Sequence, residues 1–517
     1  MRDRASATAR VDGLDCDLRG TAALVAGLGL SGFSAADALL ERGCEVVVVD
    51  DTVPAPGSAA AERARLLEVL GARLVLGEDA RRLADDPAAE LAAVDLLIAS
   101  PGWRPGHPVL LAAAAAGVTV WGEVELAWRL QGPDGPPWLV VTGTNGKTTT
   151  VELLGQILLA AGLRARTAGN IGTPLVDVVR DPAGYDVVAV ELSSFQLHLV
   201  RTVAPFASAC LNVAPDHLDW HGGPQAYRDA KAVVYARTRV ACLHNLADPV
   251  TTGMVSEADV AEGCRAVGFG LGAPAAGDLG VVEGLLVDRA FILERDRAAA
   301  ELSTVADLVA LAGEPVPAHV VANALAAAAL ARSLGVPAAA VRDGLRAARL
   351  PPHRAAALGT VAGVRWVDDS KATNPHAADA SLAASEQVVW VAGGIAKGAD
   401  YDDLVHRHAS RLLGAVLIGA DRDLLAAALR RHAPQIPVVL VDPPDTGRVG
   451  PLDDADAGRF MDRVVAAAAA LAVPGATVLL APAAASMDQF TSYVARGDAF
   501  AGAVARAAGG PSDGPGA

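Results

Sequence analysis

A glycine-rich turn that ends in lysine and threonine carries the clearest chemical signal in the sequence. Backbone N–H groups of such a turn, at the N-terminus of a helix, hold phosphate oxygens. The Lys147 ammonium would neutralise the terminal phosphates, and the Thr148 hydroxyl could ligate Mg²⁺. The turn therefore predicts ATP and Mg²⁺ as ligands. We expect it to contact ATP through Gly143, Thr144, Asn145, Gly146, Lys147, Thr148 and Thr149.

This loop is shorter than the common phosphate-loop pattern, because Gly143 and Gly146 are only three positions apart. The alternative is an ordinary strand-to-helix turn that contains a lysine by chance. Its context favours the nucleotide loop: the apolar run 138–142 predicts a strand before it, and 151–159 predicts a helix after it.

Candidate metal ligands follow the next apolar segments. Glu191 ends the run 187–190, and a carboxylate at the carboxyl end of a central strand lies beside a phosphate loop, where it can hold Mg²⁺. A solvated strand-end glutamate is the alternative. The segment 212–221 crowds His217 and His221 among aspartates, but it lacks the intervening glutamate and the third-ligand motif of zinc hydrolases. We therefore do not predict zinc.

Three alternating strand and helix patterns position these residues. The first has predicted strands at 22–26, 45–50 and 94–100, with helices after Ser31 and near Ala60. This pattern is typical of a parallel sheet flanked by helices. The Pro/Gly-rich stretch 132–137 predicts a linker, after which the strand 138–142 opens a second α/β unit.

The third α/β unit follows two predicted helices, 323–334 and 341–348, and a Leu-Pro-Pro break at 350–352. The segment 253–300 lacks helical periodicity and predicts irregular or short β structure. The predicted domains are 1–132, 133–350 and 351–517. We expect a surface loop at 443–456, a disordered tail at 509–517, and strands at 364–367, 388–392, 415–418, 438–441 and 477–480.

Composition restricts the function further. The chain has 517 residues, more than one core usually supports, and its formal net charge of −16 disfavours nucleic acid as a partner. Its apolar runs are too short for a membrane span, and 1–10 lacks the pattern of a secretory signal, so we expect a cytoplasmic protein. The five scattered cysteines contain no CxxC pair, which favours reduced thiols.

The string Gly-Thr-Asn-Gly-Lys-Thr at 143–148 resembles the Mur ligases and their folylpolyglutamate synthase relatives, and the resemblance covers nearly the whole chain. It implies Glu191 and His217 as magnesium ligands, with Thr148. It also implies that Lys231 carries a carbamate, which would make it an anionic metal ligand; as an isolated residue it would be a solvated helix lysine. Asn323 matches the asparagine that contacts adenine, although Val320 stands where relatives often carry another asparagine.

In the third unit, the resemblance assigns Arg354 and Lys371 to the transferring phosphoryl group, since cations from another domain can neutralise its charge. Asp369 would hold the ribose. As isolated residues these three would more often form surface ion pairs. The resemblance thus gives the catalytic set Lys147, His217, Lys231, Lys371 and Arg354.

The string Asp-Ser-Lys-Ala-Thr-Asn at 369–374 is typical of the branch of the family that adds D-glutamate, whereas branches adding diaminopimelate or lysine carry an Asn-Pro-Arg type motif. D-Glutamate has two carboxylates, so its pocket needs two anion-binding groups. The resemblance offers Thr373 and Lys397 for the α-carboxylate. Ser486 and Tyr493 are offered for the side-chain carboxylate, the latter through its backbone.

The first unit contains Gly27, Gly29 and Gly32 after a strand, with Asp50 ending the next one. By itself this weak motif predicts a dinucleotide site, so NAD is an alternative for this segment alone. The resemblance implies instead a site for the UDP part of a substrate. That site would use Gly29, Leu30, Ser31, Asp50, Asp51, Ser100 and Gly102, with Asn170 and His217 of the second unit.

We therefore predict a three-domain α/β protein: Rossmann-like N-terminal and C-terminal domains flank a central P-loop ATPase-type domain. The expected reaction joins D-glutamate to UDP-N-acetylmuramoyl-L-alanine through an acyl phosphate, for peptidoglycan synthesis. We expect a monomer with small-molecule substrates and no membrane partner. The alternatives are a related ligase for another amino acid and a catalytically idle ATP-binding regulatory module.

Overall fold

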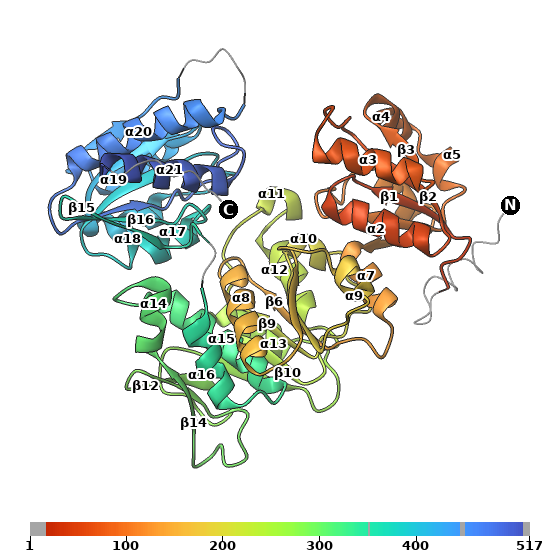
Figure 1. Ribbon diagram of the computed structural model, residues 1–517, viewed down its shortest axis with the longest axis horizontal. Helices are drawn as coiled ribbons and strands as arrows, with labels where there is room; N and C mark the ends of the chain where they lie inside the picture. The colour runs from red at the N-terminus through yellow and green to blue at the C-terminus, as the bar shows by residue number, and fades with distance from the viewer. Residues whose placement is uncertain (1–16, 350–351, 445–449, 510–517) are drawn as a thin grey trace.

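Three separate sheets organise the chain in the computed structural model, which describes residues 17–349, 352–444 and 450–509 (Figure 1). Each sheet forms its own lobe, with the central lobe between the other two. This arrangement confirms the predicted fold class. Within the described residues, no helix combines the length and apolar character that crossing a membrane requires.

The N-terminal sheet is parallel throughout, with strand order β3-β2-β1-β4-β5. Its apolar strands β1 and β4 are completely buried, as expected of strands covered by helices on both faces. Strands β3 and β5 were not predicted, because each is short and only partly buried, so its apolar pattern is weak. The elements are β1 (Ala22–Ala26), α2 (Leu30–Glu41), β2 (Glu45–Asp50), α3 (Ala59–Val69), β3 (Arg73–Leu76), α4 (Glu78–Asp85), α5 (Ala88–Leu91), β4 (Leu96–Ala99), α6 (Pro108–Ala115), β5 (Thr119–Gly122) and α7 (Glu123–Gln131).

The central sheet has nine strands in the order β14-β13-β12-β11-β10-β9-β6-β8-β7. Strands β12 to β14 pair antiparallel at one edge, and the others are parallel. The strands are β6 (Trp138–Thr142), β7 (Ala165–Gly169), β8 (Val187–Glu191), β9 (Ala207–Cys210), β10 (Ala241–Asn245), β11 (Arg265–Phe269), β12 (Leu279–Val282), β13 (Leu285–Asp288) and β14 (Ala300–Thr304). The helices are α8 (Lys147–Ala160), α9 (Leu175–Arg180), α10 (Ser194–Leu197), α11 (Leu218–His221), α12 (Pro224–Ala232), η1 (Val233–Tyr235), α13 (Pro249–Ser256), η2 (Val305–Leu308), α14 (Val309–Ala312), α15 (Ala318–Ser333) and α16 (Ala338–Ala347).

The C-terminal sheet has the order β15-β16-β20-β17-β18-β19, and only its edge strand β15 is antiparallel. Strand β17 is buried along its whole length. Its elements are β15 (Ala356–Val361), β16 (Val364–Asp368), α17 (Pro375–Leu382), β17 (Val388–Gly393), α18 (Asp402–His408), η3 (Ala409–Arg411), β18 (Leu412–Ile418), α19 (Arg422–His432), β19 (Val438–Leu440), α20 (Asp454–Leu471), β20 (Thr477–Leu480) and α21 (Tyr493–Ala507).

The structure corrects four local predictions. Helix α15 begins at Ala318, so Asn323 lies inside it rather than at its start. Residues 253–256 belong to helix α13, whereas the rest of 253–300 has the short strands expected. The strand predicted at 94–100 is shorter in the structure, where β4 spans only Leu96–Ala99. Helix α20 begins inside the predicted loop 443–456, of which 445–449 lie outside the described residues, as do 1–10 and 510–517.

Candidate active site

The phosphate loop lies between β6 and α8, at the carboxyl edge of the central sheet. Gly146 has φ 85°, and a Cβ there would lie 2.5 Å from Asn323 Oδ1, so only glycine fits this position beside α15. Lys147 Nζ donates to the carbonyl oxygens of Gly143 and Thr144 at 2.8 and 2.9 Å. Burial lowers the pKa of Lys147, while the charges of Glu191 and Asp216 oppose this shift.

Glu191 ends β8 next to this loop and is 1% exposed. Its Oε2 accepts a hydrogen bond from Thr148 Oγ1 at 2.7 Å, and its Oε1 accepts one from Asn170 Nδ2 at 2.9 Å. The structure therefore brings two of the predicted metal ligands, and one predicted substrate contact, into direct contact.

His217 and Lys231 complete the predicted ligand set from α11 and α12. His217 has the left-handed backbone conformation, with φ 52°, and burial lowers its pKa. Lys231 is 1% exposed, and its Nζ donates to Gly143 O at 2.8 Å. Burial, and then the charge of Lys147, lower the pKa of Lys231 to about 7. The predicted solvated helix lysine is thus the wrong alternative for Lys231.

Oxygen donors such as Thr148 Oγ1 and the Glu191 carboxylate are the ligands that Mg²⁺ prefers, so these residues fit one magnesium ion. Over the described ranges, no group of three or more His, Cys, Asp or Glu side chains gathers in a metal-holding arrangement. The remaining ligands of a magnesium ion here would be water and nucleotide phosphates, as is usual for Mg²⁺.

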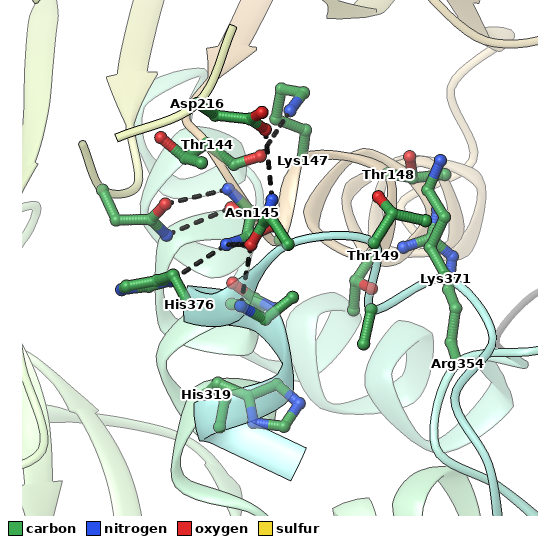
Figure 2. Close-up of a pocket in the computed structure, with 18 of the residues that line it drawn as sticks. Thr144, Asn145, Lys147, Thr148, Thr149, Asp216, His319, Arg354, Lys371 and His376 are labelled. Carbon is green, nitrogen blue, oxygen red and sulfur yellow. Dashed lines mark hydrogen bonds between the residues drawn. The ribbon is translucent and has the colours of Figure 1, made fainter. Parts of the chain in front are cut away.

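The C-terminal lobe contributes cations to the same site. Arg354 and Lys371 lie beside Thr148 and Thr149 (Figure 2). Burial, and then the charges of Arg354 and Lys147, lower the pKa of Lys371 to about 8. Its ammonium lies 4.0 Å from the centre of the Tyr493 ring. The C-terminal lobe therefore places two cations, Arg354 and Lys371, beside the phosphate loop.

Asp369 is held beside these cations. Its Oδ1 accepts a hydrogen bond from the backbone N–H of Ala355 at 3.2 Å, and its Oδ2 accepts one from Ser381 Oγ. Burial raises the pKa of Asp369 to about 6. Its carboxylate is therefore held by protein donors at the edge of the cavity.

One cavity of about 310 Å³ collects most of the predicted residues of the central and C-terminal lobes. The predicted residues Gly143, Lys397, Ser486 and Tyr493 do not line it. Tyr493 instead contacts Lys371 and accepts a hydrogen bond from Ser370 Oγ at its carbonyl, at 2.7 Å. The predicted residues that line the cavity are Thr144, Asn145, Gly146, Lys147, Thr148, Thr149, Asn170, Glu191, His217, Lys231, Asn323, Arg354, Asp369, Lys371 and Thr373.

Sequence reasoning gave no role to several other cavity residues, namely Asn212, Asp216, Tyr227, His319, Asn374 and His376. Asn374 caps α17, because its Oδ1 accepts from Ala377 N at 2.9 Å. An asparagine followed by proline is a typical helix start, so this cap was visible in the sequence. The contacts of these residues across the cavity were not visible there.

A second pocket, of about 670 Å³, lies between the N-terminal and central lobes. Of the residues predicted to bind UDP, Asp50, Asp51 and Gly102 line it, whereas Gly29, Leu30, Ser31 and Ser100 do not. Asp50 Oδ2 accepts a hydrogen bond from Leu28 N at 2.8 Å and so fixes the turn before α2. The other lining residues are Trp103, Arg104, Pro105, Gly106, His107, Asp219 and Trp220.

Ser100 packs against the glycine turn instead. A Cβ on Gly27, whose φ is +108°, would lie 2.6 Å from Ser100 Oγ, and a Cβ on Gly32 would lie 1.9 Å from Gly27 O. The two glycines therefore allow the close approach of the turn, the helix and the loop after β4.

Comparison with known proteins agrees with this geometry in all three lobes. Residues 21–122 match the MurD-like N-terminal domain of Mur ligases, residues 141–331 the Mur ligase middle domain, and residues 353–484 the glutamate ligase domain of Mur ligases. The chain is 54% identical to the UDP-N-acetylmuramoylalanine--D-glutamate ligase of Streptomyces avermitilis, over 93% of this chain and 97% of that protein. The chain belongs to the Mur ligase family.

Other Mur ligases extend the comparison. The protein of the same name from Leifsonia xyli subsp. xyli is 52% identical over 96% of this chain and 95% of its own length. Among solved structures, the UDP-N-acetylmuramate-alanine ligase MurC of Thermotoga maritima has a TM-score of 0.51 at 17% identity, covering 93% of this chain and 98% of that one. MurF of Acinetobacter baumannii has a TM-score of 0.50 at 18% identity, over 90% and 88%. At such identities the structures support the Mur ligase fold alone.

Proposed function

We propose that this protein uses ATP to join D-glutamate to UDP-N-acetylmuramoyl-L-alanine, in peptidoglycan precursor synthesis. The observation that carries the proposal is the single cavity in which the phosphate loop, Glu191 and the loop containing Lys371 meet. Relatives 54% and 52% identical over nearly the whole chain bear the name of this ligase. An idle module would not need catalytic groups from two lobes in one cavity.

The phosphate loop and the cations around it would bind the triphosphate. Lys147, Arg354 and Lys371 surround the place where the γ-phosphoryl group would lie, and their charge offsets the repulsion between triphosphate and substrate carboxylate. Mg²⁺, held by Thr148 and Glu191, would supply further charge neutralisation when bound. Asn323 and Asp369 are our candidates for adenine and ribose.

The proposed reaction has two steps. The terminal alanine carboxylate attacks the γ-phosphorus, which releases ADP and forms an acyl phosphate. The neutral amine of D-glutamate then attacks the acyl carbon; the C–N bond forms, phosphate leaves, and the amine loses a proton. The protein would contribute by holding the reacting groups from separate lobes in contact.

Lys231 is proposed to carry a carbamate. Carbamylation joins CO₂ to an uncharged amine, and a pKa of about 7 leaves much of the Lys231 amine uncharged near neutral pH. Lys147 is the cation that could balance the resulting negative charge, since its charge already acts on Lys231. A carbamate signal in ¹³C NMR after equilibration with ¹³C-bicarbonate, absent from Lys231→Ala, would test this modification.

D-Glutamate is the proposed amino acid, with Thr373 and Lys397 for its α-carboxylate and Ser486 and the Tyr493 backbone for the other. Lys397 is close enough for its charge to lower the pKa of both His217 and Lys371. Ser486 is 4% exposed, in the loop after β20. We further propose the domain limits 1–132, 133–350 and 351–517, a monomer, and a cytoplasmic location.

The experiment that tests the function measures ADP release and amide formation together. We expect sustained turnover of both to require UDP-N-acetylmuramoyl-L-alanine and D-glutamate. L-Glutamate, diaminopimelate and lysine serve as competing amino acids, and faster ligation of any of them would reject the proposed specificity. Sustained ADP release in the absence of the UDP-sugar, or in the absence of D-glutamate, would contradict the ligase mechanism.

A further inference from the structure

A set of side-chain hydrogen bonds joins the phosphate loop and the neighbouring Asp216 to the C-terminal lobe. Asn145 Nδ2 donates to Asn374 Oδ1, and Asn374 Nδ2 donates to Asn145 Oδ1, both at 3.3 Å. Asn374 Nδ2 also donates to Asp216 Oδ2 at 3.1 Å. Asn145 Nδ2 lies 2.9 Å from His376 Nδ1. Figure 2 shows this contact as a dashed line. We call Asn374 and His376, with their partners Asn145 and Asp216, the clasp.

Both sides of the clasp are anchored in the fold. The backbone N–H and carbonyl of Asn145 are held by the Asn212 side chain at 2.9 and 3.1 Å. On the other side, Asn374 caps α17 through its Oδ1. The bonds between Asn145 and Asn374 therefore connect a fixed loop of the central lobe to a fixed helix end of the C-terminal lobe.

Charge across the same interface opposes this docking. Arg354 and Lys371 come from the C-terminal lobe and face Lys147 of the phosphate loop; the charge of Arg354 lowers the pKa of Lys147, and the charge of Lys147 lowers the pKa of Lys371. Without a triphosphate, bringing these cations together costs free energy. Uncharged amide and imidazole groups can hold the lobes together without adding to that repulsion.

We propose that Asn374 and His376 are positioning residues that dock the C-terminal lobe onto the phosphate loop. The inference rests on the proposed function, because the docked lobe brings Lys371 to the nucleotide and Thr373 to the proposed site of D-glutamate, and both residues precede Asn374 in the same loop. Loss of the clasp should therefore weaken the use of D-glutamate more than the binding of ATP.

The test uses Asn374→Asp in the full-length protein. Aspartate keeps the helix cap but places a carboxylate against Asp216 and removes the donor to Asn145. We expect a larger radius of gyration in X-ray scattering without nucleotide. We also expect kcat/KM for D-glutamate to fall about tenfold or more, as the loss of two hydrogen bonds implies, and the Kd for ATP to rise by a smaller factor, because the phosphate loop keeps its own contacts. Gln435→Asp, which adds the same charge at an exposed position of that lobe, is the matched control.

His376 gives an independent arm. His376→Leu should reproduce the defect more weakly, while His376→Asn, which keeps an acceptor near the position of Nδ1, should restore part of the loss; exposed His406→Leu is the control. Unchanged scattering and unchanged kcat/KM for D-glutamate in Asn374→Asp and His376→Leu would overturn the proposal. So would weaker ATP binding with unchanged scattering, because these residues would then be nucleotide contacts. X-ray scattering does not depend on turnover. If the wild-type protein did not ligate D-glutamate but Asn374→Asp still had a larger radius of gyration, the result would support the clasp and reject the proposed function.

Discussion

The two pockets of this protein lie at carboxyl edges of parallel strands, yet they differ in charge. The cavity at the phosphate loop sets four cations, Lys147, Lys231, Arg354 and Lys371, against three carboxylates, Glu191, Asp216 and Asp369. The second pocket has three aspartates against Arg104 and His107, and Arg104 is paired with Asp219 at 3.0 Å. The first is suited to a polyanion by its side chains. In the second, three carboxylates stand against two basic side chains, so its side chains offer less positive charge to a phosphate.

The strongest test of this comparison removes a cation from the first cavity. We expect Lys147→Ala to lower kcat/KM by about a thousandfold or more, because a phosphate-neutralising charge is lost where water is largely excluded. Coupled measurement of ADP release would detect this. Circular dichroism should show an unchanged fold, since Lys147 contacts only its own loop through Nζ among the described residues. Activity within about tenfold of wild type would contradict a polyanion site here.

The second prediction concerns Lys231, the most buried cation of that cavity. Lys231→Ala should lower ligation about a hundredfold, the scale expected for loss of a metal-linked group. Formate or acetate, added as a small carboxylate in the space left by the side chain, should restore part of the activity if Lys231 acts as a carbamate. Rescue should be absent in Lys147→Ala. Full activity of Lys231→Ala would reject the metal-ligand role.

The third prediction concerns the second pocket. Asp50→Ala removes the acceptor for Leu28 N and Thr52, and with it the support for the turn before α2. We expect KM for the UDP-sugar to rise about tenfold with little change in kcat, because binding is lost equally in ground and transition states. Asp79→Ala, a carboxylate on exposed α4 of the same lobe, is the control. A fall in kcat at unchanged KM would show that this pocket acts in the chemistry instead.

The sequence predicted the first cavity better than the second for a physical reason. Lys147 stands in a short string whose chemistry is visible locally, and Glu191 ends an apolar run that predicts a strand beside it. Lys371 was assigned through the resemblance of the string 369–374 to the Mur ligases. Trp103 and Arg104 lie in a loop of the N-terminal lobe and Trp220 lies in α11 of the central lobe, so only the folded chain brings them to one pocket. Strands β3, β5 and β15 were missed because they are short or have exposed edges, so their hydrophobic pattern is weak.

The same limit applies to side chains whose role depends on a partner in another lobe. The predicted carboxylate contact of Tyr493 concerns its backbone, whereas the structure shows its ring under Lys371. Asn374 was visible as a helix cap but not as a partner of Asn145, since 229 positions separate them. Contacts between residues of different lobes depend on how the lobes dock. The hydrophobic periodicity of the sequence carries no information on that docking.

The smallest expected effect is a pH dependence of kcat/KM for ATP that is steeper than the pH dependence of kcat. The first reports the free protein and the second the nucleotide-bound protein. Burial and neighbouring cations lower the pKa of Lys371 to about 8, so the ammonium is present below pH 8 and is lost above it. From pH 7 to 8.5, kcat/KM for ATP should fall roughly fourfold, the ratio of the protonated fractions. Bound triphosphate favours the ammonium, so kcat should fall less over that range. Lys371→Arg should remove the fall in kcat/KM for ATP between pH 7 and 8.5, because the guanidinium group stays charged over that range. Lys231 and Lys147 also have lowered pKa values. If kcat/KM for ATP fell equally in Lys371→Arg between pH 7 and 8.5, the titrating group would be one of these two lysines, and Lys371 would stay charged over that range.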